Sequence, residues 1–166
     1  MILIIDVHYR DQGAKAVAGL ITDWNNNTLY KSYSLMIGDV ADYIPGQFYQ
    51  RELPCILQLL QGIDEAFDTV VIDGYVHLGT EQKPGLGHYL WNALGQQKKI
   101  IGVAKNHYQD TPAECMIYRG ESHNPLYITA LGLDLTEAKN YILNMVGAHR
   151  IPTLIKQVDT LSKAVD

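Results

Sequence analysis

The stretch MILIID, residues 1–6, decides the fold that we expect, because five apolar residues run directly into an acidic one. A short apolar run rich in β-branched residues is typical of a buried strand. The stretch VVID, residues 70–73, repeats this pattern. A carboxylate at the end of a buried strand is costly unless a metal, a hydrogen bond or a counter-charge compensates it. We therefore expect Asp6 and Asp73 to face a polar site where two strands end.

Outward from these runs, the pattern predicts one α/β domain over residues 1–166. Turn signals at 11–13 and 25–27 separate three strands of an antiparallel meander, and helices and strands then alternate. A mixed sheet of three antiparallel strands followed by parallel strands, with helices on both faces, satisfies this order. The expected strands are 1–7, 14–22, 28–36, 69–73, 99–104 and 126–129, with a short one at 115–118 in the loop 106–124, and the expected helices are 48–63, 86–95, 136–146 and 152–164.

A third acid lies in the helix between the two acidic strand ends. Pro54 fits best in the first turn of that helix, which places Glu52 at or just before its N-terminus. If the first strand pairs with residues 69–73, then strand, helix and strand each bring an acid to one point, which is the ribonuclease H-like arrangement. Oxygen ligands suit Mg²⁺ or Mn²⁺, so we expect Asp6, Glu52 and Asp73 to bind such a metal. Taken singly, each acid also has a simpler interpretation, as a cap of a strand end or as an acid favoured at a helix start.

Composition narrows the class of protein. Apolar residues make up 47% of the 166 residues, which is typical of a globular chain. The formal charge of −5 argues against a broad, non-specific nucleic-acid binder, because phosphate contacts need Lys and Arg. No apolar run approaches the roughly 18 residues of a membrane span, and the first residues lack the basic start of a signal peptide. With only two cysteines, we expect a reduced, cytoplasmic protein without a membrane partner.

Several motifs, taken together and in order, resemble the endonuclease V family. The stretch DVHY at 6–9 resembles its opening motif, and YIPGQF at 43–48 followed by RELP at 51–54 resembles its wedge loop and second acid. VIDG at 71–74 resembles the segment of the third acid, and GVAK at 102–105 a strand of the family. NPLYI at 124–128 and RIP at 150–152 also fit.

The resemblance implies a ribonuclease H-like fold and an Mg²⁺- or Mn²⁺-dependent endonuclease. Such an enzyme nicks DNA or RNA on the 3′ side of a deaminated base, chiefly inosine, in repair of damaged nucleic acid. It implies that Asp6, Glu52 and Asp73 hold the metal and that Lys105 acts beside them, near the phosphate backbone. It further implies nucleic-acid contacts, and we expect a monomer. The residues expected to make these contacts are Tyr43, Ile44, Pro45, Gly46, Gly74, Gly102 and Lys105.

Two segments depart from the family pattern. After the third acid, the family has Asp-Gly-x-Gly and later His-Pro-Arg, whereas this chain reads DGYVHLG at 73–79 with only Pro84 as a counterpart. The family's His after the NPLYI-like strand also has no match at 129–134. Two alternatives therefore stay open: a ribonuclease H-like nuclease directed to structure or RNA, and a non-catalytic relative that binds nucleic acid.

Overall fold

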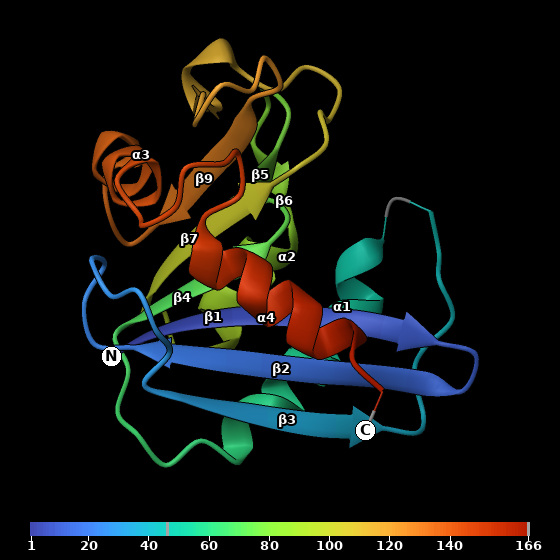
Figure 1. Ribbon diagram of the computed structural model, residues 1–166. Helices are drawn as coiled ribbons and strands as arrows, with labels where there is room; N and C mark the ends of the chain where they lie inside the picture. Colours follow the sequence, from blue (N-terminus) through green and yellow to red (C-terminus); the bar gives the residue numbers. More distant parts are fainter. Residues whose placement is uncertain (46, 166) are drawn as a thin grey trace.

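The computed structural model describes residues 1–45 and 47–165, and one seven-stranded sheet dominates it. The strands follow the order β3-β2-β1-β4-β7-β9-β8 (Figure 1). β1, β4 and β7 run parallel, while the strands on both sides of this trio are antiparallel to their neighbours. The strands of the sheet are β1 (Ile2–Arg10), β2 (Gly13–Ile21), β3 (Lys31–Ile37), β4 (Thr69–Asp73), β7 (Lys99–Ala104), β8 (Met116–Ile117) and β9 (Leu126–Leu131).

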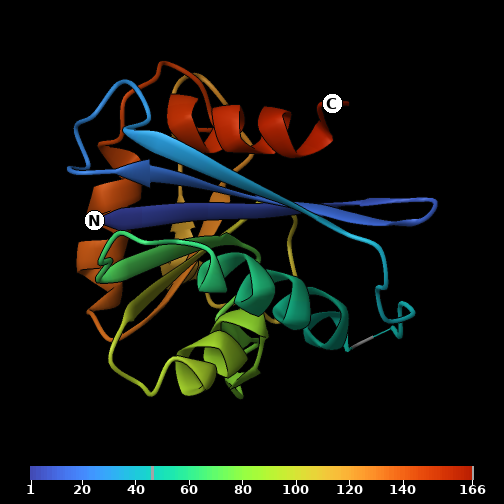
Figure 2. The ribbon, with the colours of Figure 1, turned by 90° about the horizontal axis from the view of Figure 1, so that it is seen from below.

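Helices cover both faces of this sheet, as the sequence predicts. α1 (Phe48–Gln61) and α2 (Leu86–Ala93) pack on one face, and α4 (Thr153–Lys163) crosses β1 and β2 on the other. α3 (Leu135–Leu143) packs against β9 on the same side as α4. Figure 2 shows the sheet between these layers, with α4 on one side and α1 and α2 on the other. None of the described helices combines the length and apolar character needed to cross a membrane.

Alternation along the central strands gives two separate cores. In β1, Leu3 and Ile5 face α1 and α2, while Ile2 and Ile4 face α3 and α4. Successive strand residues point to opposite faces, so a strand covered on both faces is a continuous apolar run. This explains why the sequence of residues 1–5 shows no polar alternation.

The structure differs from the expected elements at several points. β1 continues to Arg10 as a hairpin with β2, so Asp6 lies within the strand and does not end it. α1 begins at Phe48, so Glu52 is in its second turn and Pro54 is inside the helix. β9 runs antiparallel to β7, and residues 75–85 contain a small hairpin of β5 (His77–Leu78) and β6 (Lys83–Pro84) that the sequence did not indicate. A short 3₁₀ helix, η1 (Ala113–Cys115), precedes β8 in the expected loop.

Candidate active site

Two of the predicted acids lie level with each other on neighbouring parallel strands. β1 pairs with β4 from Ile2 opposite Thr69 to Ile5 opposite Ile72, and the next residues in this register are Asp6 and Asp73. β4 ends at Asp73, where the backbone N–H of Gly74 donates to the carbonyl of Val103. The parallel pairing therefore places both carboxylates at the same level, where β4 ends in the middle of the sheet.

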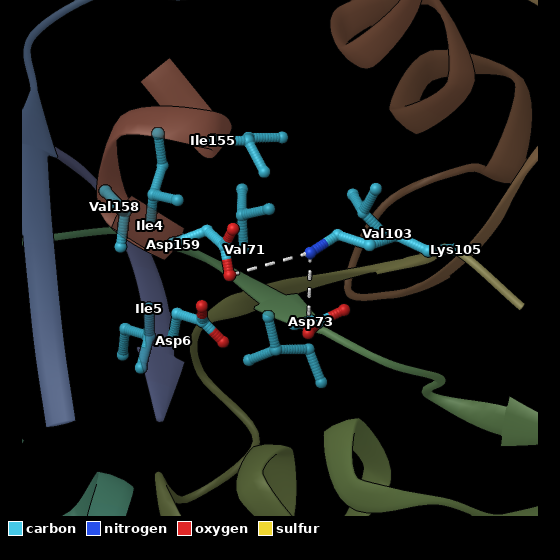
Figure 3. Close-up of a pocket in the computed structure, with 11 residues that line it drawn as sticks. Ile4, Ile5, Asp6, Val71, Asp73, Val103, Lys105, Ile155, Val158 and Asp159 are labelled. Carbon is cyan, nitrogen blue, oxygen red and sulfur yellow. Dashed lines mark ion pairs between the residues drawn. The ribbon is translucent and has the colours of Figure 1, made fainter. Parts of the chain in front are cut away.

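Lys105 and a fourth acid, Asp159, line the same small pocket. The Nζ of Lys105 lies 3.9 Å from an Oδ of Asp73 and 4.0 Å from an Oδ of Asp159. Figure 3 shows the ammonium group of Lys105 between these two carboxylates, with Asp6 on the same side. Arg150 donates to the backbone carbonyl of Lys105, which holds the chain where β7 ends. The described residues thus bring three carboxylates and one ammonium group together.

Asp159 comes from α4, far from the other acids in the sequence, and it was not predicted. Its carboxylate forms an ion pair with Lys163 at 3.2 Å. The hydroxyl of Ser162 lies 3.2 Å from Oδ2 of Asp6 and 2.7 Å from the backbone carbonyl of Asp159, so it joins α4 to β1. A detectable signal was present: Asp159 and Ser162 share the buried face of α4 with Leu154, Ile155 and Val158. A buried acid in an apolar stripe requires a partner.

The carboxylates of the pocket perturb one another. Burial, followed by the charges of Asp73 and Asp159, raises the pKa of Asp6 from its ordinary 3.8 to about 7. Burial also raises the pKa of Asp73, although Lys105 opposes this. Burial alone would raise the pKa of Asp159 too, but a hydrogen bond with Asp6 and the charges of Lys163 and Lys105 bring it below its usual value. Asp6 therefore takes up a proton at a much higher pH than an ordinary aspartate, whereas Asp159 keeps its negative charge.

Glu52 reaches toward this group from α1 and is almost fully buried, at 3% exposure. Burial, followed by the charges of Asp73 and Asp6, raises the pKa of Glu52 well above its usual value. One of its oxygens, Oε2, has no hydrogen-bond partner among the described residues. Next to it, the guanidinium of Arg51 stacks 3.7 Å from the ring centre of Tyr9. An unpaired buried carboxylate oxygen costs free energy unless a cation or a donor compensates it.

The carboxylates of the pocket and of Glu52 are the kind of ligand that a hard divalent cation prefers. This donor set consists of carboxylate oxygens, one of them unpaired, and their mutual repulsion is what a cation relieves. Within residues 1–45 and 47–165, however, no three His, Cys, Asp or Glu side chains are grouped closely enough to hold a metal. The predicted ligands Asp6, Glu52 and Asp73 therefore share one region without forming a ready cage, and the Lys105 ammonium lies beside two of the carboxylates.

A larger cavity of about 380 Å³ opens beside Asp73 and Lys105. The predicted wedge residue Tyr43 lines it and is 58% exposed, and Ile44 and Pro45 are exposed next to it. Phe48 and Tyr75 add further aromatic surface. An aromatic cavity next to carboxylates and a lysine can hold a planar base while the phosphate lies at the charged groups.

The three predicted glycines have different positions. Gly74 lines the aromatic cavity with a backbone φ of +133°, a conformation that favours glycine. Gly102 is buried in the sheet instead of on a binding surface, and a Cβ there would lie 2.5 Å from the carbonyl oxygen of Gly74. Its small size therefore lets the turn after Asp73 pack on β7. Gly46 lies outside the described residues.

Comparison with known proteins supports the resemblance that the motifs indicate. The family model for endonuclease V matches residues 1–160. The chain belongs to the endonuclease V family. Membership places it among the endonucleases that act on nucleic acid containing deaminated bases. A search of curated protein sequences gives no significant match.

Solved endonuclease V structures show the same fold. Endonuclease V of Ciona intestinalis, in complex with DNA containing an inosine followed by a ribo-adenosine, superposes with a TM-score of 0.78 at 16% identity. That match covers 98% of this chain and 83% of the other. Human endonuclease V superposes with a TM-score of 0.74 at 20% identity, and the match covers 98% of this chain and 82% of the human one. Endonuclease V of Streptomyces avermitilis superposes with a TM-score of 0.74 at 24% identity, and the match covers 98% of this chain and 79% of the other. The mixed sheet with helices on both faces is thus the ribonuclease H-like fold of this family.

Proposed function

We propose that this protein is an Mg²⁺- or Mn²⁺-dependent endonuclease that hydrolyses a phosphodiester on the 3′ side of inosine in DNA or RNA, in repair of damaged nucleic acid. One observation carries the proposal: the carboxylates of Asp6, Asp73 and Asp159 and the ammonium of Lys105 line one pocket that adjoins an aromatic cavity. Asp73 and Lys105 line both spaces. A nucleotide whose base enters the cavity would thus place its phosphate next to the charged groups.

In this proposal Asp6, Glu52 and Asp73 hold the cation. A bound divalent cation would lower the pKa of an attacking water and neutralise charge on the leaving oxygen. Glu52 offers an unpaired oxygen, and a bound cation would favour the ionised form of Asp6, whose pKa is raised to about 7 in the metal-free protein. Asp159, which α4 fixes through Lys163 and Ser162, would accept a hydrogen bond from a water or from protonated Asp6.

Lys105 would stabilise the phosphate. Its ammonium is part-exposed and already balances Asp73 and Asp159. With a cation held by the carboxylates, the Lys105 ammonium would be available for a phosphate oxygen of the substrate. The Lys105 ammonium would then lie beside developing negative charge. Removing a group positioned in this way typically slows an enzyme by about 10²–10³.

The aromatic cavity would receive the deaminated base. Extrusion of a base costs a few kcal/mol, least for a mispaired or unpaired base, which favours damaged or single-stranded substrates. Tyr43, together with Ile44 and Pro45, would fill the space that the base leaves. We further propose that the enzyme works as a monomer in the cytoplasm, in line with its composition.

A substrate comparison tests this proposal. Labelled single-stranded DNA and RNA, each with one inosine or none, are incubated with Mg²⁺, with Mn²⁺ or with EDTA. We expect metal-dependent nicking near inosine only. Nicking that is independent of inosine would reject the specificity and favour the structure- or RNA-directed nuclease. Binding without nicking under every condition would favour the non-catalytic relative.

One observation favours the altered-specificity alternative. Val76 occupies the second glycine position of the family pattern, and its side chain is fully buried. Its Cγ2 would lie 2.6 Å from a Cβ at Gly87, so it fills the space between the turn and α2. This turn after Asp73 is therefore built differently from the glycine-rich version that the family pattern implies.

A further inference from the structure

We propose that this protein has a second subsite, for an unpaired nucleobase next to the deaminated one, and that the ring of Tyr108 separates the two. The inference rests on the proposed function, because it assumes that a nucleic-acid strand occupies the aromatic cavity. It assigns a role to a cavity that the cleavage chemistry does not use.

The second cavity has a volume of about 250 Å³ and adjoins the aromatic one. Leu78 and Tyr108 line both cavities and therefore lie at the boundary between them. Tyr108 is 42% exposed. An exposed aromatic residue at this boundary lets a base stack on it, as in proteins that bind single strands.

The backbone around Tyr108 is fixed although the residue is exposed. Its N–H donates to the hydroxyl of Tyr75 at 3.1 Å, and that hydroxyl donates to the carbonyl of Asn106 at 2.6 Å. On the other side, the carbonyl of Tyr108 accepts from the N–H of Thr111 at 3.1 Å and from its hydroxyl. Tyr75 thereby ties the turn after Asp73 to the loop after Lys105. A stacking ring on an ordered backbone loses little conformational freedom on binding.

Charge decides which part of a nucleotide fits this second cavity. Glu81 and Asp110 contribute two negative charges and Lys83 one positive charge, and Lys83 pairs with Glu81 at 3.8 Å. Gln109 adds a neutral amide. A phosphate would meet a net negative wall, whereas the edge of a base offers donors and acceptors to these groups. The occupant that fits is therefore a base, while the phosphates remain near Lys105.

The test uses single-stranded oligonucleotides with one inosine in which the 5′ or the 3′ neighbouring nucleotide is replaced by an abasic residue. With the wild-type protein and Mg²⁺ or Mn²⁺, we expect one of the two abasic substrates to lose about tenfold in kcat/KM, mainly through KM. Tenfold corresponds to about 1.4 kcal/mol. Tyr108→Ala should lower kcat/KM for the intact substrate by a similar factor and remove the difference between intact and abasic substrates.

Two variants serve as controls. Tyr108→Trp keeps a stacking surface and should retain the discrimination. Tyr30→Ala removes another exposed tyrosine, 60% exposed, that lines neither cavity, and should behave like wild type. The second subsite is refuted if Tyr108→Ala still distinguishes the intact from the abasic substrate. It is also refuted if the wild type shows the same kcat/KM for both abasic substrates as for the intact one.

A binding measurement separates this inference from the proposed function. The fluorescent base 2-aminopurine is placed next to inosine, and the protein is titrated in EDTA, where no cleavage occurs. We expect quenching that depends on Tyr108. Quenching without nicking in metal would reject the proposed enzyme and keep the subsite, whereas nicking without quenching would keep the enzyme and reject the subsite.

Discussion

Replacing Asp6 by Asn should stabilise the metal-free protein while abolishing its activity. Asp6 is 9% exposed and lies near Asp73 and Asp159, and these surroundings raise its pKa to about 7. An Asn side chain resembles the protonated form: its amide can donate to Asp159, and its oxygen can still accept from the N–H of Val7, which now bonds to Oδ1 of Asp6 at 3.0 Å. The variant should therefore fold as the protonated wild type does at every pH.

The size and sign of the effect follow from linkage. An acid with a raised pKa in the folded state holds its proton there while the unfolded chain releases it. The contribution of Asp6 to wild-type stability should therefore fall as pH rises from about 4 to about 7, and this contribution should stay level above that. A rise from 3.8 to about 7, at roughly 1.4 kcal/mol per pKa unit, corresponds to about 4 kcal/mol as an upper limit. At pH 8 the free energy of unfolding of Asp6→Asn should exceed that of wild type by up to this amount. At pH 4 the two values should be nearly equal.

Urea unfolding of both proteins in EDTA at pH 4, 6 and 8 measures this difference. Addition of Mg²⁺ at pH 8 should then stabilise the wild type and leave the variant unchanged, because a bound ligand stabilises only the form that binds it. A variant that is no more stable than wild type at pH 8 would refute the assigned repulsion. An equal Mg²⁺ effect on both proteins would refute Asp6 as a ligand.

Three further substitutions test other parts of the structure. Lys105→Ala should lower the nicking rate at saturating substrate by about 10²–10³ with little effect on the urea midpoint, and an unchanged rate would exclude its role at the phosphate. Arg119→Met should lower the free energy of unfolding in urea by roughly 3 kcal/mol, because this buried side chain donates to five backbone carbonyls between Leu143 and Arg150. A loss below about 1 kcal/mol would contradict that role. Gly102→Ala should destabilise the protein by about 1–3 kcal/mol and slow nicking, because the new Cβ would clash with the carbonyl oxygen of Gly74. Unchanged stability would show that the turn after Asp73 can move aside without cost.

Local patterns predicted the part of the site that parallel strands build. An apolar run that ends in an acid occurs twice, and pairing of β1 with β4 then forces Asp6 and Asp73 to the same level. The bounds of β4 and β7 agree with the sequence prediction because both are buried on two faces and flanked by polar residues. The GVAK motif likewise placed Lys105 at the end of β7, next to Asp73.

The remaining parts depend on interactions that are not local. β1 extends past Asp6 because β2 pairs with it as far as Arg10, so the polar residues there belong to a hairpin. The sequence prediction placed Pro54 in the first turn of α1, but this proline lies inside the helix, whose actual first turn has no capping side chain to mark it. Asp159 follows Asp73 by more than eighty residues, and only the packing of α4 across β1 and β2 brings it to the site.

A paired measurement on wild type and Asp73→Asn tests the carboxylate site itself. Mg²⁺ or Mn²⁺ binding is measured by calorimetry, and nicking of an inosine-containing single strand is measured on the same samples. We expect the wild type to bind the metal and to nick on the 3′ side of inosine, and we expect the variant to lose both together while its unfolding midpoint is maintained. A variant that binds metal and nicks as wild type does would contradict the assignment of Asp73, and with it the carboxylate site.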